Sequence, residues 1–192
     1  MSGFIEGIDR EQTTLFPERL EDWIGEDHLV RVVDLFVDEL DLAELGFTRH
    51  VSARTGRPGY HPAVLLKLFI YGYLNRIPSS RRFEREAGRN VELMWLTGRL
   101  VPDHKTIADF RRDNSAAIGR TCARFVELCR RIGTLKGACV AIDGSKFKAV
   151  NSRDRNFTKR KIANRLAHLE ADVARYIDEM VRIDRQESGA AR

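Results

Sequence analysis

Residues 62–74 are apolar on almost every side of the helix that they are expected to form, which strongly restricts the possible folds. The apolar side chains of this stretch are Val64, Leu65, Leu66, Leu68, Phe69, Ile70, Tyr71, Tyr73 and Leu74. Pro62 suits the first turn of a helix, where its missing N–H costs no hydrogen bond. A helix that is hydrophobic all round must be buried. The sequence therefore predicts a helical domain with this helix at its centre.

Shorter helical patterns stand on both sides of this central helix. They cover residues 28–45, with a stop at Gly46, and residues 80–89, 91–96, 103–112 and 115–132. Asp103 is expected to cap the helix that follows it. The helices at 91–96 and 103–112 are separated by six residues and are similar to a loose helix-turn-helix. In that arrangement Lys105, Arg111 and Arg112 are candidate DNA contacts.

Arginines recur at one-turn spacing along the helix expected at 80–89. Arg81, Arg85 and Arg89 stand at i, i+4 and i+8, and Arg82 lies beside them. Such a stripe can neutralise successive phosphates of a nucleic acid. The alternative is a solvated face whose arginines pair with Glu84 and Glu86. The basic, Gly- and Pro-containing segment at 48–61 is likewise either a DNA-contacting arm or a solvated connector.

Charge is distributed unevenly along the chain. Residues 1–50 contain 4 Lys and Arg against 13 Asp and Glu, whereas residues 51–192 contain 29 against 15. A basic body of this kind indicates a polyanionic partner. The acidic leader either covers part of the basic surface or only aids solubility.

An apolar stripe with alternating spacings of four and three runs through the last part of the chain. Its members are Ile162, Leu166, Leu169, Val173, Tyr176, Met180 and Ile183. This heptad pattern predicts a long helix that packs on another helix. The partner is either a helix of the same chain or a helix of a second copy or of a full-length relative.

The uncharged run from Ala138 to Ile142 is typical of a buried strand, and Asp143 stands where this strand would leave the core. A carboxylate at such a position must be paired, hydrogen-bonded or bound to a cation. The alternative is an ordinary Asp-Gly turn, formed with Gly144.

Several ordered motifs together resemble those of a known family. They are HPAVLLKL, YGY, SSRR and PDHKTIADFRR, followed by VAIDGSKFKAVNS. In this order they resemble the N-terminal half of bacterial insertion-sequence transposases of the DDE type, with an InsH-like N-terminal domain. The resemblance runs from about Glu26 into the heptad helix.

This resemblance implies an RNase H-like catalytic fold in which two Asp and one Glu bind two Mg²⁺ ions. Asp143 would be the first of these acids, both as catalytic residue and as metal ligand. Lys146, Lys148 and Asn151 would lie near the DNA backbone. The implied partner is the terminal-repeat DNA of the element, and the implied reaction is Mg²⁺-dependent strand cleavage and transfer.

The later acids of the chain do not follow the order of that triad. They stand in the basic segment after Asn151 or on the heptad helix, and no strand pattern precedes them. One carboxylate cannot supply the ligands of a two-metal site. We therefore expect a transposase truncated after its first catalytic strand and catalytically incomplete. The alternatives are a helix-turn-helix DNA-binding regulator or dominant inhibitor, and a structural remnant that binds nothing.

The expected fold is mainly α, with four successive parts. An acidic leader covers 1–25, a DNA-binding helical domain 26–133, the first strand region of an RNase H-like α/β domain 134–156, and a long heptad helix with a frayed tail 157–192. Cys122 and Cys129 are expected to be reduced core thiols in a cytoplasmic protein. Neither a zinc site nor a membrane segment is expected.

Overall fold

The computed structural model describes residues 4–5, 19–48, 59–132 and 159–190. This part of the chain is mainly helical, as the sequence predicts. The elements in chain order are strand β1 (Phe4–Ile5), 3₁₀-helix η1 (Leu20–Trp23), α1 (Leu29–Asp38), strand β2 (Gly59–Tyr60), α2 (Pro62–Asn75), α3 (Ser80–Ala87), α4 (Val91–Thr97), α5 (His104–Ile132) and α6 (Lys159–Ala190). β1 and β2 form a short parallel pair in which Phe4 faces Gly59 and Ile5 faces Tyr60.

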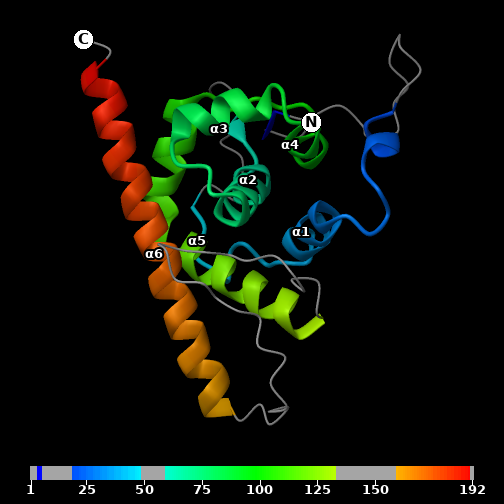
Figure 1. Ribbon diagram of the computed structural model, residues 1–192, viewed down its shortest axis with the longest axis vertical. Coiled ribbons are helices and arrows are strands. Elements are labelled where there is room, and N and C mark those ends of the chain that lie inside the picture. Colours follow the sequence, from blue (N-terminus) through cyan, green and yellow to red (C-terminus); the bar gives the residue numbers. More distant parts are fainter. Residues whose placement is uncertain (1–3, 6–18, 49–58, 133–158, 191–192) are drawn as a thin grey trace.

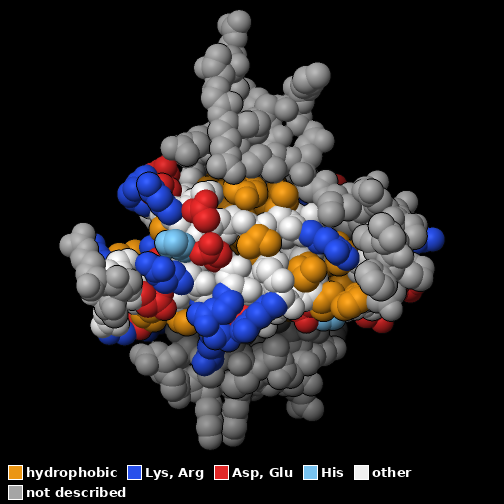
Figure 2. Space-filling model, turned by 90° about the horizontal axis from the view of Figure 1, so that it is seen from above, with side chains coloured by type: hydrophobic (Ala, Val, Ile, Leu, Met, Phe, Trp, Pro, Cys, Tyr) orange, Lys and Arg blue, Asp and Glu red, His pale blue; other side chains and the backbone are white. Residues whose placement is uncertain are grey.

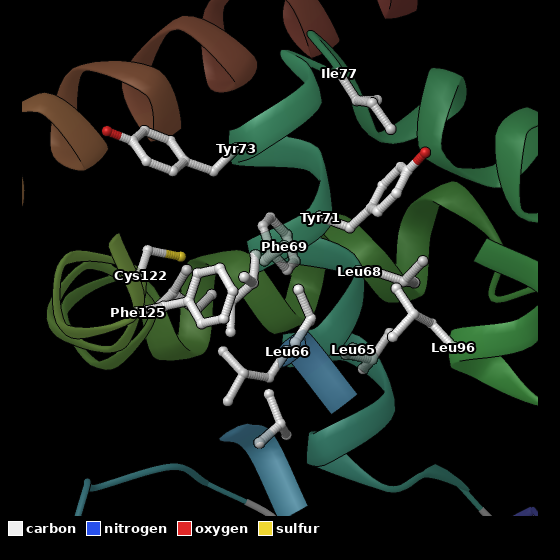
Figure 3. Close-up of a cluster of buried hydrophobic side chains, with 14 of the residues drawn as sticks. Leu65, Leu66, Leu68, Phe69, Tyr71, Tyr73, Ile77, Leu96, Cys122 and Phe125 are labelled. Atoms are coloured by element: carbon white, nitrogen blue, oxygen red, sulfur yellow. The ribbon is translucent and has the colours of Figure 1, made fainter. Parts of the chain in front are cut away.

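The apolar helix α2 lies in the middle of the other helices, with α1, α4 and α5 packed around it (Figure 1). Its side chains from Leu65 to Tyr73 are all buried (Figure 3). Phe69 stacks against Phe110 of α5 and lies 5.4 Å from the ring of Phe83 in α3. The predicted central position of this helix is therefore confirmed.

The N-terminus of α2 follows the predicted chemistry. Pro62 is the first helical residue, and the imidazole Nδ1 of His61 accepts a hydrogen bond from the backbone N–H of Ala63 at 3.2 Å. Burial lowers the pKa of His61, which favours the neutral imidazole that can accept this bond. His61 therefore serves as a helix cap.

A lysine of α2 pairs with two carboxylates of α1 across the interface between these helices. The ammonium Nζ of Lys67 lies 2.7 Å from Asp34 Oδ1 and 2.7 Å from Asp38 Oδ1. Lys67 and Asp34 are both buried, whereas the Asp38 side chain is half exposed. Lys67 is thus an interior cation on a helix that is otherwise apolar.

Gly72 allows α3 to approach the backbone of α2. A Cβ atom at this position would stand 2.0 Å from Cζ of Phe83 and 3.0 Å from the hydroxyl of Tyr176 in α6. Because real Cβ contacts are never this short, only glycine fits between these two rings. Gly72 lies in a regular helix, so glycine is needed here for its small size and not for an unusual backbone conformation.

The helix predicted over 28–45 is shorter than expected and ends at Asp38. The carboxylate of Asp41 accepts hydrogen bonds from the backbone N–H groups of Ala43 and Glu44, which starts a separate turn. Gly46 closes this turn at φ +79°, a conformation that glycine adopts without steric cost. The early end of α1 thus has a local cause in the Asp41 side chain.

α5 bends at Asn114, whose φ of −129° and ψ of 17° are not helical. Figure 1 shows the change of direction. The side-chain oxygen of Asn114 accepts hydrogen bonds from the backbone N–H of Thr48 at 2.8 Å and from its hydroxyl at 3.1 Å. The predicted interruption between 112 and 115 is therefore present as a kink within one long helix.

α6 packs on the kinked α5 of the same chain, with contacts to its parts before and after the kink (Figure 1). Its buried side chains are Leu169, Val173, Ile177 and Met180. The hydroxyl of Tyr176 donates a hydrogen bond to the carbonyl of Ile77 at 2.8 Å. The heptad stripe therefore finds its partner helix in cis. Ile177, which the predicted stripe did not include, is buried with it.

Cys122 and Cys129 lie on α5 and are buried in the core, as predicted. Burial raises the pKa of Cys122 to about 12. The predicted strand at Ala138–Ile142 lies outside the described residues. Among the helices that are described, none is both long and apolar enough to cross a bilayer.

Candidate nucleic-acid interface

Helix α3 has an apolar and a basic side. Ser79 caps it by accepting a hydrogen bond from the N–H of Arg82 at 3.2 Å. Phe83 and Ala87 point into the core and are fully buried. Arg82 and Arg85 are exposed on the other side. The helix therefore presents guanidinium groups to the solvent while its own packing fixes their position.

The predicted arginine stripe is brought together on and just after this helix. Arg82 and Arg89 both pair with Glu86, with Arg82 Nε 2.8 Å from the carboxylate. The hydrogen bond from Arg89 is the main reason that the pKa of Glu86 is lowered. Part of the stripe is thus paired internally, as the alternative interpretation expected. Arg85 forms no ion pair with any described residue.

Glu84 does not join these pairs and instead connects α3 to the start of α5. Its carboxylate lies 2.7 Å from Nδ1 of His104 and accepts the His104 backbone N–H at 3.2 Å. Asp103 caps α5 by accepting the N–H of Thr106 at 2.8 Å. This bond is the main cause of the lowered pKa of Asp103. The start of α5 is therefore fixed next to the basic helix.

Helices α4 and α5 are separated by six residues, as the sequence predicts. Gly98 and Arg99 both have positive φ, and they reverse the chain after α4. Thr97 donates its hydroxyl hydrogen towards backbone carbonyls, with the oxygens of Leu93 and Leu100 each at 2.9 Å. The loop is therefore ordered, although it is longer than the tight turn of a helix-turn-helix.

α4 is connected to η1 and α1 by a network that sequence reasoning did not find. The indole N–H of Trp95 donates to Glu21 of η1 at 2.8 Å, and Glu21 also pairs with Arg31 of α1. The Arg31 guanidinium lies over the Trp95 ring at 5.2 Å from its centroid. These residues are distant in sequence and carry no motif, so no pattern linked them.

The other predicted DNA contacts of the helical part divide into two groups. Lys105 is exposed in the first turn of α5 and forms no ion pair with a described residue. Arg112 is exposed and pairs with Asp109 and Asp113 of its own helix. Arg111, in contrast, is buried, with 5% of its surface exposed. Its position in the interior removes it from the surface that a DNA duplex can reach in this conformation.

Arg111 is held by the C-terminal part of α6. Its Nη1 lies 2.8 Å from Asp184 Oδ2 and donates to Ser80 Oγ at 3.2 Å. Asp184 also accepts hydrogen bonds from Ser80, and Glu187 accepts the hydroxyl of Ser79 at 3.1 Å. Sequence reasoning did not identify Asp184 and Glu187 as partners of these residues. Their only signal in the sequence is that they stand three residues apart, just after Ile183 of the heptad stripe.

Some of the exposed basic side chains gather on one face of the molecule, while others lie elsewhere on α5 and α6. Lys and Arg gather in the lower centre of the face seen from above, with Asp, Glu and His side chains next to them (Figure 2). α3 lies near this face in Figure 1. Such a mixed surface suits contacts with a phosphate backbone, because the guanidinium groups can exchange carboxylate partners for phosphates.

The remaining predicted site residues are Asp143, Lys146, Lys148 and Asn151, and they lie outside the described residues. Among the described residues no group of three or more His, Cys, Asp or Glu could hold a metal ion. The described helices therefore provide a basic surface and no metal centre.

A protein-family model described as "Transposase domain (DUF772)" matches residues 18–113, which is half of the chain. The match begins just before η1 and ends one residue before the kink at Asn114. No curated protein gave a match. No solved structure gave a match either. The match includes α1 to α4 and the first part of α5, and the chain belongs to this transposase-domain family.

Proposed function

We propose that the helical part of this chain binds the end DNA of an insertion sequence as part of a DDE transposase. The observation that carries the proposal is the exposed basic side of α3 within a domain of a transposase family. Arg82, Arg85 and Arg89 lie on or just after this helix, and Lys105 begins the next long helix. Duplex DNA is the polyanion that a transposase must hold.

In this proposal the arginines of α3 contact phosphates and position the duplex. Phosphate contacts set register and orientation but carry no sequence information. The first turn of α5, with Lys105, would approach base edges in the way the second helix of a helix-turn-helix does. The bond between Glu84 and His104 would keep these two contact regions at a constant separation.

Replacing Arg85 by alanine should weaken binding of a short DNA duplex about threefold to tenfold and lower the salt slope by about one. The reason is the loss of one exposed guanidinium that has no acidic partner among the described residues. Fluorescence anisotropy over a series of KCl concentrations measures both quantities.

Arg124→Ala is the matched control, because it removes one exposed arginine from the second half of α5. It should change the affinity by less than about twofold. Equal effects of Arg85→Ala and Arg124→Ala would show that binding depends on net charge and not on the α3 surface.

We further propose that Asp143 is a Mg²⁺ ligand of the transposase reaction. The support is the resemblance of its Asp-Gly-Ser motif to the first acid of DDE enzymes, together with the family of the preceding domain. Of the two ions of such a site, one would activate the attacking oxygen and the other would stabilise the leaving oxygen of phosphoryl transfer. The described residues contain no group of acids, histidines or cysteines that could hold such an ion, so we assign no reaction step to them.

Asp143→Asn should leave DNA affinity in EDTA unchanged, because the α3 surface makes the phosphate contacts. It should abolish any gain in affinity that Mg²⁺ provides to the unchanged chain. Anisotropy titrations with and without Mg²⁺ measure this difference. A gain from Mg²⁺ that persists in the variant contradicts the role of Asp143 as ligand.

A further inference from the structure

The N-terminus of α3 and one buried arginine form a cluster of hydrogen-bond donors, which we name the cradle. It consists of the Ser79 hydroxyl, the Ser80 N–H and hydroxyl, and the Arg111 guanidinium. Asp184 fills it, with Oδ1 2.8 Å from Ser80 N, Oδ2 2.7 Å from Ser80 Oγ and Oδ2 2.8 Å from Arg111 Nη1. Glu187 Oε1 lies 3.1 Å from Ser79 Oγ.

The chemistry of the cradle is that of an anion site. The Ser80 N–H and the positive end of the helix dipole at the start of α3 favour a negative charge. Arg111 adds a full positive charge whose side chain is only 6% exposed. Its Nε is buried without a hydrogen-bond partner, so the guanidinium retains one unused donor. Two carboxylates do not use all the donors of this site.

The donors and the carboxylates come from different parts of the chain. Ser79, Ser80 and Arg111 all lie within the residues that match the transposase domain, 18–113. Asp184 and Glu187 lie on α6, outside that match. The anion site therefore belongs to the family domain, whereas the groups that fill it belong to a separate helix.

We propose that the cradle binds one backbone phosphate of DNA and that the end of α6 occupies it in the absence of DNA. This inference rests on the proposed DNA-binding function and adds a site to it. A phosphate presents more acceptor oxygens than a carboxylate, so it can accept from the Arg111 guanidinium and from the serine groups together. The cradle lies at the start of α3, which also carries the half-buried Arg81 and the exposed Arg82, so displacement of the end of α6 would let one duplex reach both.

The attachment of α6 allows its end to move separately. The side chains buried on α5 run from Leu169 to Met180. Beyond them Asp184 and Glu187 are half-buried, and the Arg81 contact to Glu187 is a long one at 3.9 Å. Displacement of the last two turns therefore costs mainly the polar contacts of the cradle, which the phosphate replaces.

The test compares acids of α6 that fill the cradle with acids of α6 that do not. Asp184→Asn is matched by Asp178→Asn, and Glu187→Gln is matched by Glu179→Gln, because each pair removes the same charge from the same helix. Asp178 and Glu179 are exposed, and Glu179 pairs only with Arg182 among the described residues. A short DNA duplex is the probe, followed by anisotropy over a KCl series.

We expect Asp184→Asn to bind the duplex about fivefold more tightly than Asp178→Asn, with a salt slope steeper by about one because one more phosphate is neutralised. Glu187→Gln should bind about twofold more tightly than Glu179→Gln, since it leaves the buried pair of Arg111 and Asp184 intact. A thermal melt of each variant shows whether it is folded. If Asp184→Asn does not fold, the comparison of Glu187→Gln with Glu179→Gln decides whether α6 competes with DNA for the cradle.

Equal affinities and slopes within both pairs, while the unchanged chain binds DNA, overturn the cradle but leave the proposed function standing. Absence of duplex binding in all chains overturns the proposed function and the cradle with it. A calorimetric titration with inorganic phosphate separates the two sources of the anion. Phosphate binding to Asp184→Asn with no gain in DNA affinity shows a site for the free ion and overturns the DNA assignment.

Discussion

Replacing Lys67 by methionine should lower the free energy of unfolding by about 3–5 kcal/mol, the cost of breaking a buried ion pair from one side. The ammonium of Lys67 lies 2.7 Å from carboxylate oxygens of Asp34 and Asp38. Methionine keeps the length of the side chain but leaves the carboxylate of Asp34 in the interior without this cation. Urea unfolding followed by circular dichroism measures the change.

Two further variants separate burial from simple loss of charge. Asp38→Asn should cost less than about 1 kcal/mol, because the Asp38 side chain is 50% exposed. The double variant Lys67→Met and Asp34→Leu should recover most of the loss, since an apolar pair needs no desolvated charge. If Lys67→Met alone is neutral, the contact between α1 and α2 does not depend on this pair.

Replacing Gly72 by alanine should destabilise the fold by about 2–3 kcal/mol, although alanine favours helix formation. The added methyl group would stand 2.0 Å from Cζ of Phe83, which is fully buried and has no space to withdraw. The hydroxyl of Tyr176 closes the other side at 3.0 Å. Either α3 or α6 must therefore shift away from α2. A thermal or urea melt measures the loss.

Gly119 provides the matched control because it lies inside α5 and a Cβ atom there would have no neighbour within 4 Å. Gly119→Ala should stabilise the protein by about 0.5–1 kcal/mol through helix propensity alone. Adding Phe83→Leu to Gly72→Ala should recover part of the lost stability by making space. A stabilising effect of Gly72→Ala would contradict the close packing of α2 and α3.

The helical core could be predicted from the sequence because its signals are local. The run from Leu65 to Tyr73 has no polar side and must be central, and Pro62 and Asp103 mark helix starts by their own chemistry. The sequence also predicted the interruption of α5 between residues 112 and 115, which is the kink at Asn114. The end of α1 was predicted too late, because the apolar spacing continues past Asp38 while the Asp41 carboxylate starts a new turn.

The candidate interface was predictable only in part, since a charge pattern does not show which charges are buried. Arg85 and Lys105 are exposed, as a surface contact requires. Arg111 is an arginine like Arg85 and stands next to the exposed Arg112, yet its side chain is buried. Its partner Asp184 is distant in sequence, and only the folded chain brings the two together. Such long-range pairs leave no periodic signal.

The pairing of Arg111 with Asp184 also has a consequence for synthesis of the protein on the ribosome. The arginine leaves the exit tunnel well before its acidic partner, and at about 5–20 residues per second the delay is roughly 4–15 seconds. Within this interval the nascent helical body cannot form the buried ion pair between Arg111 and Asp184. The link that Asp184 makes between Ser80 of α3 and Arg111 of α5 therefore forms only after translation of the last helix.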